Sequence, residues 1–423
     1  MMNLFTNKVA LLWDESFLWG VMAVRALRAA GLPFALLRAE DIRAGRLDGH
    51  TMLFVPGGWA SNKAKALGEE GAEAIRRFVH EGGSYLGICG GAGLATQDGI
   101  GLLEVKRRPT KERVPSFSGR IHLNITDHPL WKGLNERGDE SLIFHAWWPS
   151  QFIVEDSSIK VLATYGAALP DAFSSDLNAG DVEAIGAWSG LEERYGINLD
   201  PGRLLNDPAV IQGSYGKGTV VLSLIHFDTP DDDNGRRVLI NLWSCLGHTE
   251  AQQPSELPSL RTSALPYHDA SALMSEMEEA VDELIALGLR NFLWFWRNPL
   301  LLQWRRGVRG LEYNTLFILI KEIGMLMRRA ENGATSSPII AEKMRGTETL
   351  LVPFIKQAQR LLLLERQALQ NGRITYEKCD DPEIREIRMH LFSSAKSYGG
   401  AFKKLIDETD RLLYALLVPG SIP

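Results

Sequence analysis

The sequence predicts an α/β domain built around a largely parallel sheet, followed by an all-α helical bundle domain. Up to residue 248, short apolar runs alternate with helical patterns, which implies parallel strands joined by crossover helices. Residues 249–266 contain three prolines and many small polar residues, which is typical of a linker. Only helical periodicity follows. We therefore expect an α/β domain at 1–248 and a helical bundle domain at 267–423.

The elements of the first domain follow from its apolar runs and from the glycines that end them. The first four strands are expected at 9–13, 34–37, 52–55 and 85–88, with helices at 17–30 and 71–81. Later runs are shorter and rich in turn residues, and they indicate strands at 121–125, 142–144, 161–164 and 185–188. The last strong strand is expected at 218–227, and the last helix at 235–246.

The second domain shows four helical patterns, at roughly 270–297, 312–332, 337–370 and 382–417, which predict an antiparallel bundle. Within it, the segment 292–306 (FLWFWRNPLLLQWRR) places three tryptophans beside arginines. Such a segment either meets a membrane interface or a partner, or packs the end of the bundle against the first domain. The helical domain is thus open to self-association or to binding a protein partner.

Composition excludes several classes of protein. With 45% hydrophobic and 23% charged residues, the chain is neither disordered, collagen-like nor a disulfide scaffold. A net charge of −6 gives no indication of nucleic-acid binding.

Three cysteines in 423 residues indicate a reducing compartment, and the first residues lack the features of a signal peptide. No apolar run is long enough to cross a bilayer, so we expect no transmembrane segment. With the cysteine count and the charge, this predicts a cytoplasmic protein that has no nucleic-acid partner.

Cys89 lies in the segment that is most informative about chemistry. The run YLGICGGAGLA, residues 85–95, takes a buried strand through a glycine-rich turn directly into a helix, which is the context of a nucleophile elbow. Gly87 and Gly91 supply the bare backbone that such a strained turn needs. The helix N-terminus would favour the thiolate of Cys89. The alternative is a buried structural cysteine in a strand–helix turn.

A base for this thiolate is expected at the end of the last strong strand. There His226 and Asp228 alternate with Phe227, so both side chains can project from the same side of an extended segment. His226 would then serve Cys89 while Asp228 orients the imidazole. The alternative is a histidine at a strand end that happens to precede an acidic turn.

Donors for an oxyanion are expected in the loop Pro56-Gly57-Gly58, which follows the strand at 52–55. Its glycines let backbone N–H groups approach a substrate carbonyl, and Gly58 and Gly90 together could form the hole. The same tripeptide is also a common turn after a strand.

Taken together, Pro56-Gly57-Gly58, Gly87-Ile88-Cys89-Gly90-Gly91 and His226-Phe227-Asp228 resemble the class I glutamine amidotransferase-like superfamily. Within it, the stretch from Pro56 to Ala95 is most similar to the domain at the N-terminus of some biotin–protein ligases. The stretches 127–134 and 216–226 are similar to later parts of the same family. The resemblance covers about residues 8–248.

This resemblance implies a flavodoxin-like, doubly wound α/β fold with a Cys89–His226–acid triad, and with Gly58 and Gly90 as the oxyanion donors. Asp228 stands where the superfamily usually has a glutamate, so the acid here has the shorter side chain. Nothing after residue 265 resembles a synthetase that would take up ammonia, and no biotin-ligase catalytic domain follows.

Weaker candidates surround this set. A substrate pocket could be lined by Gly57, Trp59, His145 and Trp147. Adjacent tryptophans such as Trp147-Trp148 are, however, as often packing residues. Asp14 follows the first strand and either contacts the nucleophile or caps the helix that begins near Phe17. The nine histidines are scattered without ligand spacing, so we expect no metal, and we expect no cofactor. Cys245 is expected to pack within its helix and Cys379 to be a surface thiol.

Two functions follow from these residues. The first is a cysteine-dependent amidase or glutaminase-type hydrolase, which acts on a small amide or related carbonyl through a thioester. The second is a non-catalytic ligand-binding or scaffolding protein, whose degenerate pocket senses a metabolite while the helical domain binds a partner.

Overall fold

The computed structural model describes residues 9–134, 142–248, 267–331, 338–372, 375, 379–394 and 397–418. The chain divides into two compact units, residues 1–255 and 256–423, which are described separately here. The expected linker at 249–266 lies outside the described residues. The expected fold class is confirmed: the first unit is an α/β structure and the second is largely helical.

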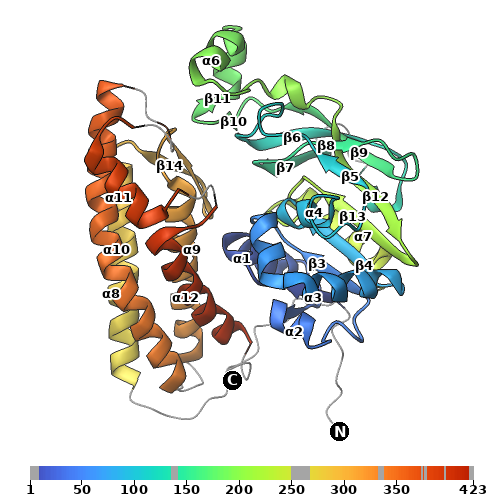
Figure 1. Cartoon of the computed structure of the whole chain (residues 1–423), viewed down its shortest axis with the longest axis horizontal. Helices are drawn as coiled ribbons and strands as arrows, with labels where there is room; N and C mark the ends of the chain where they lie inside the picture. The colour runs from blue at the N-terminus through green and yellow to red at the C-terminus, as the bar shows by residue number, and fades with distance from the viewer. Residues whose placement is uncertain are drawn as a thin grey trace. The chain divides into compact units, whose positions relative to one another are not determined.

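The first unit is built on an 11-stranded mixed sheet within the described residues (Figure 1). Its strand order is β11-β10-β6-β9-β12-β13-β4-β3-β1-β2, with β7 paired to β6. The parallel strands are β1 (Val9–Leu12), β2 (Ala35–Leu37), β3 (Met52–Val55), β4 (Ser84–Ile88) and β13 (Gly218–Ser223). The antiparallel extension contains β6 (Phe117–Ile125), β7 (Ile143–Trp147), β9 (Lys160–Ala168), β10 (Phe173–Ser174), β11 (Leu177–Asn178) and β12 (Pro208–Tyr215). A separate pair joins β5 (Val105–Arg107) to β8 (Phe152–Val154).

The helices of this unit include the crossovers expected between parallel strands. They are α1 (Phe17–Ala29), α2 (Ala39–Arg43), α3 (Ala60–His80), α4 (Gly90–Ala95), α5 (Ala179–Ala184), α6 (Trp188–Tyr195) and α7 (Asp233–Cys245). Two predictions were wrong here. Helix α3 begins eleven residues before the expected 71–81 and is interrupted at Gly68, where φ is 63°. Residues 185–188 form no strand: 185–187 connect α5 to α6, Trp188 begins α6, and Ile185 is 76% exposed.

The order of the central strands positions the candidate site. Strands β13, β4 and β3 are parallel neighbours, with Leu222 opposite Gly87 and Val55 opposite the same glycine on the other side. The carboxyl ends of these three strands therefore meet at one edge of the sheet, which is where open α/β sheets bind ligands.

In the second unit, helices α8, α9, α12 and α10 pack in that order around a shared core (Figure 1). The described helices are α8 (Tyr267–Arg290), α9 (Gly310–Glu331), α10 (Pro338–Asn371), α11 (Pro382–Phe392) and α12 (Gly400–Leu417). The expected single helix at 382–417 is thus two helices, and Ser393, with φ 56°, ends the first of them. No helix in the described ranges is long and apolar enough to cross a membrane.

The end of the helix expected at 270–297 is instead a β-hairpin, β14 (Trp294–Asn298) and β15 (Leu301–Trp304). Asn298 makes the turn because its side-chain oxygen accepts hydrogen bonds from the Leu300 and Leu301 N–H groups, at 2.8 and 2.9 Å. Trp294 is buried, and its indole donates to the Ile285 carbonyl at 3.0 Å. At least this tryptophan therefore packs within its own unit.

The helical unit also buries a charged pair. Arg388 Nε donates to Glu365 Oε1 at 2.8 Å, and the Glu365 side chain has no exposed surface. Burial raises the pKa of Glu365 to about 7, although the Arg388 guanidinium opposes the rise. A carboxyl whose pKa is higher in the folded state binds its proton more tightly there. The free energy of unfolding therefore falls as the pH rises from about 4.5 to about 7 and then levels off.

We expect the Glu365→Gln variant to lack this pH term. Between pH 5 and pH 8, wild type should lose up to about 3 kcal/mol of unfolding free energy relative to the variant. Urea unfolding at each pH, followed by circular dichroism, measures the difference. A difference that stays constant across this range would show that Glu365 ionises at an ordinary pH.

Candidate active site

Cys89 occupies a strained turn between β4 and α4. Its φ and ψ are 51° and −104°, in a region that residues with a side chain rarely adopt. The Cys89 N–H donates to the Ser223 carbonyl on β13 at 2.7 Å, which fixes the turn to the neighbouring strand. The side chain is half-buried, and its Sγ lies 4.0 Å from the Trp147 carbonyl oxygen.

The glycines on either side of Cys89 leave no room for a side chain. A Cβ on Gly87 would lie 2.6 Å from the Gly91 carbonyl oxygen, and one on Gly91 would lie 1.9 Å from the Val55 carbonyl oxygen. The buried Tyr85 hydroxyl donates to the same Gly91 carbonyl at 2.7 Å. Backbone therefore packs directly on backbone around the cysteine.

His226 and Asp228 form a buried pair beyond the end of β13. His226 Nδ1 and Asp228 Oδ1 are 2.9 Å apart, and neither side chain has exposed surface. The Trp19 ring packs against the imidazole with a centroid distance of 4.8 Å. The shorter arm of an aspartate therefore reaches the histidine directly. His226 Nε2 makes no hydrogen bond within the described part of the chain.

The charge state of His226 depends on both neighbours. Burial alone lowers its pKa, but the Asp228 carboxylate, followed by Cys89, outweighs burial and raises the pKa to about 10. An imidazolium at neutral pH is the state that stabilises a neighbouring thiolate.

The loop after β3 lies against both of these elements. A Cβ on Gly57 would lie 3.1 Å from His226 Cε1, and one on Gly90 would lie 1.9 Å from the Gly58 carbonyl oxygen. Gly58 itself has φ 119°, and a Cβ there would lie 2.3 Å from the Glu15 carbonyl oxygen. The predicted loop, the predicted turn and the predicted histidine thus lie in one place.

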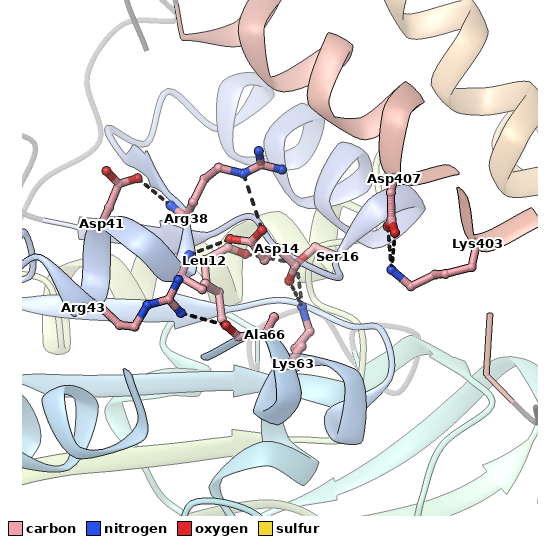
Figure 2. Close-up of polar contacts among 11 residues, drawn as sticks. Leu12, Asp14, Ser16, Arg38, Asp41, Arg43, Lys63, Ala66, Lys403 and Asp407 are labelled. Atoms are coloured by element: carbon pink, nitrogen blue, oxygen red, sulfur yellow. Dashed lines mark hydrogen bonds and ion pairs between the residues drawn. The ribbon is translucent and has the colours of Figure 1, made fainter. Parts of the chain in front are cut away.

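Lys63 is a buried cation behind this loop that sequence reasoning missed. Lys63 lies near the start of α3, and its side chain has no exposed surface. Figure 2 shows its ammonium donating to Ser16 Oγ at 2.6 Å and to the Asp14 carbonyl at 3.2 Å. Both acceptors belong to the turn 14–17, where Glu15 and Phe17 have positive φ. Lys63 therefore holds the strained turn whose Glu15 carbonyl packs on Gly58.

Asp14 neither contacts Cys89 nor caps α1, the two roles expected for it, among the interactions of the described residues. Its carboxylate accepts the Ala39 N–H at 2.5 Å and pairs with Arg38 at 3.4 Å, so it stabilises the start of α2 (Figure 2). Ser16, and not Asp14, is the N-cap residue of α1.

His145 and Trp147 lie on β7 near the site. The Trp147 carbonyl approaches Cys89, and the buried Trp147 indole donates to Thr229 Oγ1 at 3.0 Å. The half-buried His145 ring stacks on Trp147 and bonds to Asp232 Oδ2 at 2.8 Å. Asp232 was missed because its acidic run suggested only a turn. Trp59, the last of the expected pocket residues, is 38% exposed at the start of α3.

The other cysteines differ from Cys89. Cys245 is exposed at the end of α7, which corrects the expectation that it packs within the helix, and Cys379 is half-buried. Among the described residues, no cluster of three histidine, cysteine, aspartate or glutamate side chains could hold a metal ion.

The packing of backbone around Cys89 predicts a large effect of one methyl group. Gly91→Ala is expected to lower the free energy of unfolding by about 3 kcal/mol or more, because its Cβ would collide with the Val55 carbonyl. Gly190→Ala in α6 is the control, since a Cβ there meets nothing within 4 Å, and it should stabilise the chain by up to about 1 kcal/mol. Urea unfolding followed by tryptophan fluorescence compares them. Equal stability of Gly91→Ala and wild type would contradict the close packing.

Comparison with known proteins identifies one segment. Residues 47–99 match the family model described as "Biotin-protein ligase, N terminal", which confirms the resemblance over a range that includes Gly58 and Cys89. None of the curated proteins matches the chain.

Solved structures are similar only at a distance. A glutamine amidotransferase is 20% identical, with 56% of this chain and 97% of that chain covered and a TM-score of 0.34. A β-galactosidase from Bacillus circulans is 15% identical, with 56% and 30% covered and a TM-score of 0.33. A cytoplasmic protein from Salmonella typhimurium LT2 is 11% identical, with 56% and 99% covered and a TM-score of 0.35. These values are too low to bear on function.

Proposed function

We propose that the first unit is a cysteine-dependent amidase of the glutamine amidotransferase type. Cys89 is the nucleophile, His226 the general base and acid, and Asp228 the residue that orients the imidazole. The observation that supports this most strongly is the meeting of three neighbouring strand ends, which brings the Gly57-Gly58 loop, Cys89 and the His226–Asp228 pair together.

In the acylation half of the reaction, the Cys89 thiolate attacks the carbonyl carbon of an amide. The new S–C bond forms as the carbonyl π electrons move to oxygen, and the N–H groups of Gly58 and Gly90 stabilise the oxyanion. When the carbonyl re-forms, the C–N bond breaks and its electron pair stays on nitrogen. That nitrogen takes the proton from His226 Nε2, so ammonia or an amine leaves and a thioester remains.

In the hydrolysis half, neutral His226 accepts a proton from water, and the resulting hydroxide attacks the thioester carbon. The C–S bond then breaks with its electron pair on sulfur. This returns the thiolate and the imidazolium and releases a carboxylic acid, which loses its proton to solvent. The Asp228 carboxylate stabilises the imidazolium in the resting state and holds Nδ1 so that Nε2 is the nitrogen that exchanges protons.

Alkylation by iodoacetamide tests the pairing of Cys89 with His226. Because the pKa of His226 is raised to about 10, its imidazolium carries a positive charge at neutral pH and favours a neighbouring thiolate, so we expect wild type to react several-fold faster than His226→Ala at pH 7. Intact-mass and peptide analysis locates the label. Labelling only at Cys245 or Cys379 would favour the non-catalytic, ligand-binding alternative.

Asp228→Asn tests the orienting role. Removing the charge that stabilises the imidazolium should slow acylation of Cys89 by a p-nitrophenyl ester at least about tenfold. Asp232→Asn, on the second histidine–carboxylate pair, is the matched comparison and should have a smaller effect. Release of p-nitrophenolate measures both rates. An unchanged rate in Asp228→Asn would show that Asp228 has no part in the acylation of Cys89.

A further inference from the structure

Arg107 packs on α4, the helix that follows Cys89. It ends β5, which pairs with β8 so that Arg107 is opposite Phe152. Its guanidinium packs over Gly93 in α4, where a Cβ would lie 2.7 Å from Arg107 Nη1. Helix α4 begins immediately after Cys89, so the glycine under this cation is about one helical turn beyond the cysteine along the backbone.

Arg113 approaches the same place from the neighbouring loop. Its Nη1 lies 3.5 Å from the Pro149 carbonyl, two residues beyond Trp147, whose own carbonyl is 4.0 Å from Cys89 Sγ. Burial lowers the pKa of Arg113 and repulsion from Arg107 lowers it further, while Cys89 opposes both. Arg113 is therefore within electrostatic range of Arg107 and of the nucleophile.

Neither guanidinium has an acidic partner in the part of the chain that the structure describes. The Nε atoms of both are buried and make no hydrogen bond there. Arg108, between them in sequence, also has a buried Nε without a hydrogen bond, but its Nη2 pairs with Asp207 at 3.4 Å. Partly buried like charges with unsatisfied donors are costly, and a bound anion would both pair with the donors and reduce the repulsion.

We propose that Arg107 and Arg113 bind an anionic group of the substrate, a carboxylate or a phosphate, so that the amide attacked by Cys89 belongs to a negatively charged compound. The planar guanidinium fork matches the oxygens of either group, and a bound anion removes the repulsion between the two arginines. This inference rests on the proposed role of Cys89 and adds the class of substrate to it.

Two alkylating reagents that differ in charge test the proposal. Iodoacetate and iodoacetamide react in the same way: the Cys89 thiolate forms a bond to the CH2 carbon and iodide leaves with the electron pair. The ratio of the iodoacetate rate to the iodoacetamide rate therefore reports the local charge and not the reactivity of the thiol. We expect this ratio to fall at least about tenfold in the Arg107→Gln/Arg113→Gln double variant.

Arg108→Gln is the matched control, since it removes a neighbouring arginine that already has a carboxylate partner, and it should leave the ratio within about twofold. Arg107→Lys/Arg113→Lys keeps both charges and should keep most of the wild-type ratio. This variant also provides a test of the charges if the glutamine double variant does not fold. An unchanged ratio in the glutamine double variant, or an equal fall in Arg108→Gln, would overturn the proposal.

A binding measurement separates this proposal from that of catalysis. Succinate and inorganic phosphate should each be tested by calorimetry against wild type and the variants. If Cys89 reacts with neither reagent, the catalytic proposal fails, while binding lost in the glutamine double variant alone still supports the anion site. Preference for succinate or for phosphate identifies the group. Binding of neither anion to wild type would contradict the site.

Discussion

The direct packing of backbone on backbone around Cys89 is the constraint on which the rest of the site depends. Gly91 lies against Val55, Gly90 against Gly58, and Gly58 against the Glu15 carbonyl, each with no room for a Cβ. These contacts pack the segments that follow β4, β3 and β1 tightly together at one edge of the sheet. A cysteine held at φ 51° there has little freedom, and backbone N–H groups of neighbouring segments lie at fixed positions around it.

Buried charged side chains line this edge. The His226–Asp228 pair, with no exposed surface, keeps a proton beside the sulfur at neutral pH. Lys63 holds the turn 14–17 through Ser16 and the Asp14 carbonyl, next to the Gly57-Gly58 loop. Burying each of these groups costs free energy, which its hydrogen-bond and charge partners offset. In our proposal, Arg107 and Arg113 extend the same arrangement toward a charged substrate.

Much of this arrangement could be predicted from the sequence, because strand ends and glycines leave local signals. The runs before Pro56, Cys89 and His226 are apolar, which predicts buried strands. Gly87 and Gly91 flank Cys89, which predicts the tight turn. Lys63, Arg107 and Arg113 left no such signal, since a charged residue is buried only by elements that are distant in sequence. The hairpin at 294–304 was missed for a related reason: its aromatic residues satisfy helical spacing as well as strand alternation, and Asn298 decides between them through two local hydrogen bonds.

The central claim is that Cys89 forms a covalent acyl intermediate with help from His226. Intact-mass spectrometry after mixing with a p-nitrophenyl ester observes that intermediate directly, at successive times. Wild type should gain one acyl group on Cys89 that is then lost to hydrolysis, whereas Cys89→Ser should gain none there and His226→Gln should gain it slowly. Acylation confined to the exposed Cys245, with Cys89 unmodified in wild type, would contradict the account.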